Sequence, residues 1–200
     1  MSTMMRVTTV LLFAVLAVSG CSGGDEDVPD NQPVKPASAP SGWTTTDLGP
    51  VSIATPPEWE KQPSTEPSQT MTATTWRAKE VDGISPGGVE VRVISSPQQD
   101  AGKAAQALAI NAMSTLQAGD VEPEKIVWPR SELAYYIAYT SEVPVETDPA
   151  APRKPYVTRT LVLDLADGSQ VQVNALVDED SDEKLPDQVV STAKLAEAED

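Results

Sequence analysis

The side chains best suited to chemistry in this sequence are one cysteine, Cys21, and 30 carboxylates, and histidine is absent. Without histidine, Ser-His-Asp and Cys-His mechanisms are excluded, because both use an imidazole as the general base. Two carboxylates alone can hydrolyse a glycoside. The candidates for such a pair are Glu58, Glu60, Glu90 and Glu132. A chain this acidic supplies such candidates by chance, so a carboxylate-only hydrolase is a minor alternative.

The segment before Cys21 has the layout of a secretory signal. Arg6 supplies a positive charge, residues 10–18 form an apolar run, and the small residues Ser19 and Gly20 follow. A charged start, a short apolar run and small residues are typical of a signal peptide. The run is much shorter than the ~20 residues that span a bilayer. Residues 1–20 are therefore predicted to be a signal peptide.

The four residues Val18-Ser19-Gly20-Cys21 resemble the lipobox of bacterial lipoproteins. The resemblance implies cleavage between Gly20 and Cys21 and a diacylglycerol on the Cys21 thiol. An ordinary signal peptide followed by a coincidental cysteine is the alternative, but Cys21 is the only cysteine in the chain and stands where the lipobox requires it. We therefore expect an extracytoplasmic protein held at the cell membrane by this lipid. We expect no other cofactor, and no thiol is left for a disulfide or a metal.

The charge balance excludes one class of partner. The chain has 14 Lys and Arg against 30 Asp and Glu, a net charge of −16, which becomes −17 without Arg6, the only charged residue in the signal. Nucleic-acid binding needs positive charge to neutralise phosphates, so we expect none. An acidic body also repels anionic lipid head groups, so it should stand off the membrane.

The mature chain divides into a tether and one domain. Residues 21–41 contain the lipidated Cys21 followed by small, acidic and proline residues, and too few apolar side chains to fold. We expect a disordered tether there and a folded domain over residues 42–200. Residues 89–93 alternate apolar and charged side chains, which is typical of a strand with one buried face. Residues 100–119 are alanine-rich with helical spacing, and Gly119 is placed to end that helix.

The remaining segments complete an α+β pattern. Strands are predicted over residues 43–48, 51–55, 71–78, 124–128, 133–139, 156–164 and 170–177, and a last helix over residues 186–198. This order predicts a single α+β domain with a mostly antiparallel sheet, packed by the alanine-rich central helix and the C-terminal helix. An acidic run at 178–183 suggests a calcium loop, but Glu183 stands where an EF-hand needs glycine, so no metal is expected.

Two further groups of residues are candidate sites. The proline-rich segment 144–155 is long for a loop, and Arg153 and Lys154 place two positive charges there, so it is the candidate partner loop. The second group would line a cavity for a small apolar or lipid ligand, beside the alanine-rich helix. It consists of Trp128, Tyr135, Tyr136 and Tyr139.

Two segments carry a family resemblance. Residues 51–59, Val-Ser-Ile-Ala-Thr-Pro-Pro-Glu-Trp, look like the opening of small exported PsbP-like domains, and residues 171–193 look like their closing strand, acidic turn and helix. With the lipobox, the chain resembles actinobacterial Lpq lipoproteins of the LpqN and LpqT type, which implies a PsbP-like α/β/α sandwich without a catalytic motif. The leading hypothesis is a non-enzymatic binding or accessory module for envelope or secreted proteins. The alternative is the ligand carrier.

Overall fold

The core of the fold is a seven-stranded antiparallel sheet. The computed structural model describes residues 28–63, 68, 70–81, 83–144 and 153–197. In spatial order the strands are β3 (Glu60–Lys61), β4 (Met71–Arg77), β5 (Gly87–Ile94), β9 (Gln170–Asp178), β8 (Arg153–Leu165), β7 (Ser131–Pro144) and β6 (Glu124–Ile126). Every neighbouring pair is antiparallel.

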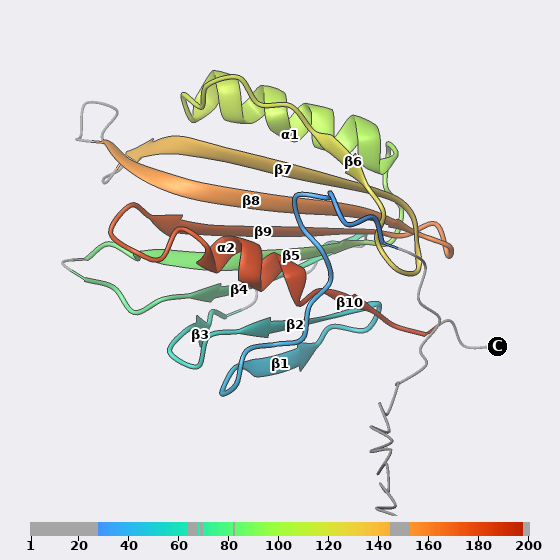
Figure 1. Ribbon diagram of the computed structural model, residues 1–200, viewed down its shortest axis with the longest axis horizontal. Helices are drawn as coiled ribbons and strands as arrows, with labels where there is room; N and C mark the ends of the chain where they lie inside the picture. The colour runs from blue at the N-terminus through green and yellow to red at the C-terminus, as the bar shows by residue number, and fades with distance from the viewer. Residues whose placement is uncertain (1–27, 64–67, 69, 82, 145–152, 198–200) are drawn as a thin grey trace, which may run out of the picture.

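Elements pack on both faces of this sheet (Figure 1). Helix α1 (Ala101–Thr115) lies over β7 and β8. Helix α2 (Leu185–Ser191) packs on the other face, where a small sheet of β1 (Thr44–Asp47), β2 (Val51–Thr55) and β10 (Lys194–Leu195) joins it. The predicted fold class, a single α+β domain with a mostly antiparallel sheet and two helices, is confirmed. No helix in the part of the chain that the structure describes is long and apolar enough to cross a membrane.

Alternation along the strands sorts side chains between the two faces. In β5, Val89 and Val91 are buried with β2 and α2, whereas Glu90 and Arg92 point to the α1 side. In β8, Leu161 and Leu163 belong to the same core as Val89, and Val162 packs against α1. Strand β8 is therefore apolar on both faces at the place where both faces are covered.

Helix α1 begins at a double cap and ends earlier than predicted. The Asp100 carboxylate accepts the Lys103 N–H at 2.8 Å, and Asp164, on β8, accepts the Ala101 N–H at 2.7 Å. These bonds satisfy amides that have no partner inside the helix. Leu116 is the last capping residue, and Gln117 adopts a positive φ of 54°. Gly119 therefore does not end the helix, because the chain reverses two residues before it.

The C-terminal helix is shorter than the sequence predicted. It stops at Ser191, and β10 then pairs with β2, Leu195 opposite Val51. The Thr192 hydroxyl accepts the Ala54 N–H at 2.9 Å, which fixes this change of direction. The prediction of a helix over residues 186–198 is wrong because pairing with the edge of β2 gives the backbone partners that a longer helix would have supplied. Residues 198–200 lie outside the described residues.

The last two thirds of the predicted tether, residues 28–41, pack against the domain, and we call this segment the strap. Val34 is 4% exposed and belongs to the main core. The Ala37 N–H donates to the Ser191 carbonyl at 2.7 Å, and the Gln32 amide donates to the Val127 carbonyl at 3.1 Å and accepts its N–H. A disordered tether is therefore wrong for residues 28–41. The signal, Gly20, Cys21 and residues 22–27 lie outside the described residues.

Candidate functional site

The α1 side of the sheet is only partly covered. Helix α1 contacts β7 and β8, and beside it two hollows open over β5 and β9. The near hollow, about 170 Å³, lies between α1 and the sheet, and the far hollow, about 450 Å³, extends toward the start of β5. Glu90 and Asn174 line both hollows, so together they form one surface, which we call the trough.

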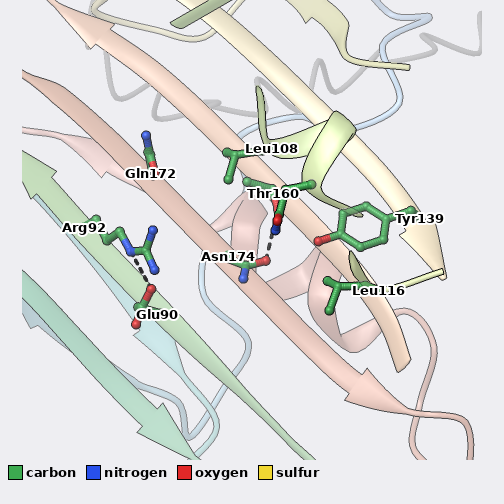
Figure 2. A pocket seen from close by; sticks show the side chains of 9 residues that line it. Glu90, Arg92, Leu108, Leu116, Tyr139, Thr160, Gln172 and Asn174 are labelled. Carbon is green, nitrogen blue, oxygen red and sulfur yellow. Dashed lines mark hydrogen bonds and ion pairs between the residues drawn. The ribbon is translucent and has the colours of Figure 1, made fainter. Parts of the chain in front are cut away.

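Four polar side chains form the floor of the near hollow (Figure 2). Glu90 on β5 is opposite Asn174 on β9, and Arg92 is opposite Gln172. Neighbouring strands are about 4.8 Å apart, and residues two apart on a strand are separated by about 6.8 Å. The four side chains therefore form a compact rectangle, which we call the platform, with a charged pair on one strand and an amide pair on the next.

Each side chain of the platform makes one polar contact inside the protein. Arg92 Nε is 2.6 Å from a Glu90 carboxylate oxygen, the Thr160 hydroxyl donates to the Asn174 amide oxygen at 3.0 Å, and the Gln172 amide donates to Gln170 at 2.8 Å. Among the described residues, no partner is found for the terminal nitrogens of Arg92, the amide nitrogen of Asn174 or the amide oxygen of Gln172. The platform therefore holds donors and acceptors that a ligand can use.

The rim of the near hollow is more apolar than its floor. Leu108 and Leu116 come from α1 and its cap, and Tyr139 comes from β7. Burial raises the pKa of Tyr139, and contacts of its hydroxyl with Thr158 and Thr160 offset this in part. Tyr139 is therefore a neutral phenol that can pack or exchange a hydrogen bond at neutral pH.

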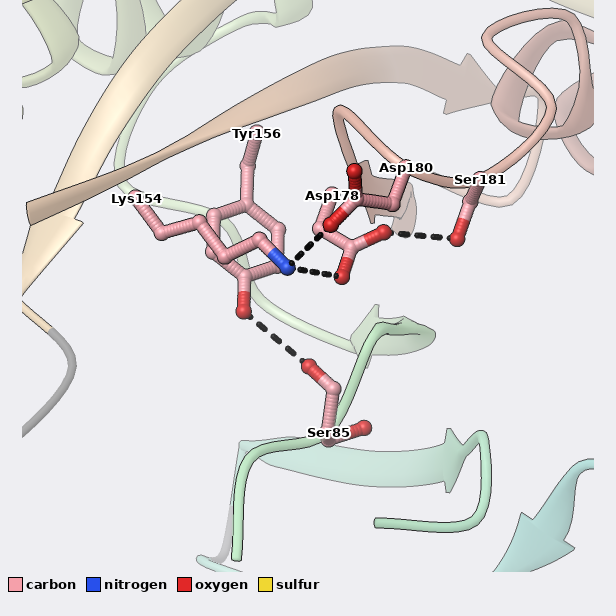
Figure 3. Close-up of polar contacts among 6 residues, drawn as sticks. All are labelled: Ser85, Lys154, Tyr156, Asp178, Asp180 and Ser181. Atoms are coloured by element: carbon pink, nitrogen blue, oxygen red, sulfur yellow. Dashed lines mark hydrogen bonds and ion pairs between the residues drawn. The ribbon is translucent and has the colours of Figure 1, made fainter. Parts of the chain in front are cut away.

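A half-buried ion pair lies beside Tyr156, which lines the far hollow (Figure 3). Lys154 Nζ is 2.7 Å from Asp178 and 2.9 Å from Asp180, and Tyr156 donates to the Ser85 carbonyl at 3.0 Å. Burial alone would raise the pKa of Asp178, but the hydrogen bonds from Lys154 and Ser181 outweigh it and lower that pKa. The hydrogen bonds that Lys154 donates to Asp178 and Asp180 raise its own pKa. Within the acidic run at 178–183, Asp178 is thus buried and paired with Lys154.

Both ends of the predicted partner loop belong to strands. Pro144 pairs with Arg153, and Glu142 with Pro155, so both ends of the 144–155 segment belong to β7 and β8. Arg153 donates to the Glu142 carbonyl at 2.9 Å, and Lys154 is held by Asp178. The two charges are therefore engaged within the domain. Residues 145–152 lie outside the described residues.

The residues predicted to line one cavity lie on opposite faces of the sheet. Tyr135 and Tyr139 pack on the α1 side, whereas Trp128 and Tyr136 belong to the core beneath α2. Tyr136 donates to Asp187 on α2, which also accepts from Arg159 at 3.0 Å. Successive side chains of a strand point to opposite faces, so Tyr135 and Tyr136 cannot line the same cavity. The sequence pattern was therefore sufficient to exclude the predicted cavity lining.

The four candidate acids are also dispersed. Glu90 lies in the trough, Glu58 lines a hollow beside Trp59, and Glu132 lines another near the start of α1. Neither the trough nor these two hollows contain two of the four carboxylates, Glu60 included. Within the same residues no group of three His, Cys, Asp or Glu side chains is arranged to hold a metal ion. The sequence analysis did not identify the platform, although the alternation in β5 places Glu90 and Arg92 on one face.

Comparison with known proteins adds little to this description. No family model and no curated protein matches the chain. A Bacteroides thetaiotaomicron protein of known structure is 10% identical, with a TM-score of 0.44 over 74% of this chain and 46% of its own. The chain thus spans less than half of that protein. The Ran-binding protein Mog1p of Saccharomyces cerevisiae is 14% identical, with a TM-score of 0.40 over 74% of this chain and 87% of its own. The resemblance to Lpq lipoproteins stays a prediction.

Proposed function

We propose that this chain is an exported, lipid-anchored binding module that engages a partner through the trough and catalyses no reaction. The observation that carries the proposal is the platform, where Arg92, Gln172 and Asn174 keep polar atoms without partners among the described residues. Concave surfaces with a few convergent polar groups are the default binding-site hypothesis in an unassigned fold. The absence of histidine from the sequence supports a binding role over acid–base catalysis near neutral pH.

The location half of the proposal depends on Cys21 and is tested separately. Cys21→Ala should move the protein from the membrane fraction to the soluble exported fraction, because roughly 0.8 kcal/mol of membrane affinity is lost for each acyl CH₂ that no longer inserts. Ser22→Ala is the matched control, since it leaves the thiol in place. Mass spectrometry that finds an unmodified Cys21 in the mature protein would contradict the lipid anchor.

The binding half is tested by photo-crosslinking in intact cells. Asn111 is exposed and lines the near hollow, whereas Gln188 is exposed on α2, on the opposite face of the sheet. A benzoylphenylalanine at Asn111 should form a discrete adduct that is absent when the same group replaces Gln188. Equal adducts at both positions, or none at Asn111, would rule out the trough as the partner surface.

A further inference from the structure

The chemistry of the platform distinguishes between kinds of partner. Its free donors belong to Arg92 and Asn174, and its free acceptors are the Gln172 amide oxygen and the Glu90 carboxylate. Because Glu90 is opposite Asn174 and Arg92 is opposite Gln172, donors and acceptors alternate both along and across the two strands. A ligand that matches this floor must itself alternate donors and acceptors.

An extended polypeptide has this alternation in its main chain. On one edge of an extended chain, N–H and C=O groups alternate, and each kind recurs every two residues, or about 6.8 Å. Glu90 and Arg92 beneath it are two residues apart on β5, so the first can accept an N–H and the second can donate to a C=O of the same edge. A helix satisfies its backbone internally and would need an apolar floor instead. The free polar atoms therefore favour an extended segment over a docked helix.

The shape of the trough agrees with an extended occupant. The near hollow lies beside the flank of α1 that carries Leu108, and the far hollow continues along β5 and β9 past Gly88 to Tyr156. A strand-like segment that follows the trough would place alternate side chains against Leu108 and Leu116 at the rim. Main-chain bonds to the floor would supply affinity, and these rim contacts would supply selectivity.

Charge sets the composition of the segment. The whole chain carries a net charge of −16, whereas Glu90 and Arg92 neutralise each other on the platform. Helix α1, which forms the wall, has Lys103 as its only charged residue. Long-range attraction therefore steers a cationic segment toward the domain, and the neutral trough does not repel its backbone on arrival.

We infer that the trough binds an extended, lysine- or arginine-flanked segment of a partner polypeptide through its main chain. This inference rests on the proposed function and specifies its partner. Asn174 is the central residue, because it lines both hollows and its amide nitrogen is free.

The test begins with random octapeptides displayed on phage and selected on the full-length protein. The enriched peptides should be basic, and a fluorescein-labelled copy should bind with an anisotropy change at 150 mM salt. Two further copies carry N-methyl groups at alternate peptide nitrogens, one on the odd positions and one on the even positions. One copy should bind about five- to tenfold more weakly per lost hydrogen bond, while the other should bind nearly as well, because only one edge of an extended peptide faces the floor.

Asn174→Asp is the decisive protein variant. The carboxylate still accepts the Thr160 hydroxyl but has no N–H to donate. Its added negative charge would by itself strengthen binding of a basic peptide, so a weakening of about fivefold or more reports the lost donor. Gln188→Glu makes the same chemical change on the opposite face and should not weaken binding.

Several results would overturn the inference. Equal binding by both methylated copies, a helical bound peptide, or unchanged binding by the Asn174→Asp protein would each show that the trough does not bind a main chain. If the Asn111 crosslinker captures a glycan and no peptide is selected, the inference fails and the binding-module proposal survives. If that crosslinker captures nothing, the proposed function fails as well.

Discussion

Val34 provides the sharpest check on the strap, the segment where the structure departs most from the sequence-based prediction. Val34→Ala removes two carbon atoms from a side chain that is 4% exposed and packed in the main core. At about 0.8 kcal/mol for each buried CH₂, the transfer loss is about 1.6 kcal/mol, and the cavity left behind raises the total to about 2 kcal/mol. For a chain of this size, the expected fall in Tm is about 4–8 °C.

Val81→Ala is the matched control, because Val81 is 64% exposed and the same two carbon atoms contribute little there. Its effect should stay within about 0.5 kcal/mol. Both proteins are unfolded thermally and in urea, with tryptophan fluorescence and far-UV circular dichroism as probes. Coincident transitions by the two probes would support the use of a single free energy of unfolding.

Equal melting temperatures for the Val34→Ala and Val81→Ala proteins would refute the packed strap. The domain would then begin near Gly42, as the sequence alone predicted. A lowered Tm also has a consequence for the anchor, since only the six residues between Cys21 and Val28 would separate the lipid from the strap. Chain that short reaches about 15 Å on average, so the domain would stay near the bilayer surface.

Two further predictions concern stability. Asp178→Asn should lower the Tm at pH 7, because the lowered pKa of Asp178 stabilises the fold in full above the ordinary pKa of about 4. The difference from the unsubstituted protein should shrink as the pH falls below about 4 and vanish once Asp178 is protonated in the folded state. The raised pKa of Lys154 keeps its contribution intact until the pH exceeds about 10. A constant Tm difference down to pH 2 would contradict this linkage. Gly88→Ala should cost about 1–3 kcal/mol in urea unfolding, because its Cβ would lie 2.5 Å from the Trp76 carbonyl oxygen, whereas Gly119→Ala has no atom within 4 Å and should be neutral.

The periodic parts of the fold could be predicted from the sequence. Alternation at residues 89–93 and helical spacing at 100–119 identify β5 and α1, because burial of one face imposes these patterns directly. Element ends are set by other contacts. Helix α2 stops where β2 offers an unpaired edge, and Val34 is buried by a core that residues 28–41 do not reveal.

Prolines led the sequence analysis to place the start of β8 three residues too late, at residue 156 and not at Arg153. Pro155 lies inside β8, where a missing N–H would normally break the sheet. Strand β9 pairs with β8 only from Tyr156 onward, so Pro155 has a neighbouring strand on one side alone, that of Glu142. A proline is tolerated where one side of a strand is unpaired. The start of β8 extends past the end of β9 because of the register in which these two strands pair. The sequence pattern alone does not predict that register.

The trough follows from how much sheet one helix can cover. A helix about 10 Å across spans two strands that are 4.8 Å apart, and α1 lies on β7 and β8. The sequence of β8, with Leu161, Val162 and Leu163 in succession, belongs to a strand covered on both faces, whereas β9 alternates Val171, Gln172, Val173 and Asn174 because one of its faces is open.

A sheet face that is open to solvent carries polar side chains simply because water can hydrogen-bond them. An open polar face is therefore no evidence of a ligand by itself. The trough differs from such a face in two respects. Its polar floor is half-buried beneath an apolar rim that includes Leu108 and Leu116. Arg92 is held by Glu90 and Asn174 by Thr160, and each keeps further nitrogen atoms free for a ligand. Side chains fixed in this way lose little entropy when a ligand binds. That preorganisation is the physical reason to expect binding at the platform rather than at the equally polar but fully exposed surfaces elsewhere on the domain.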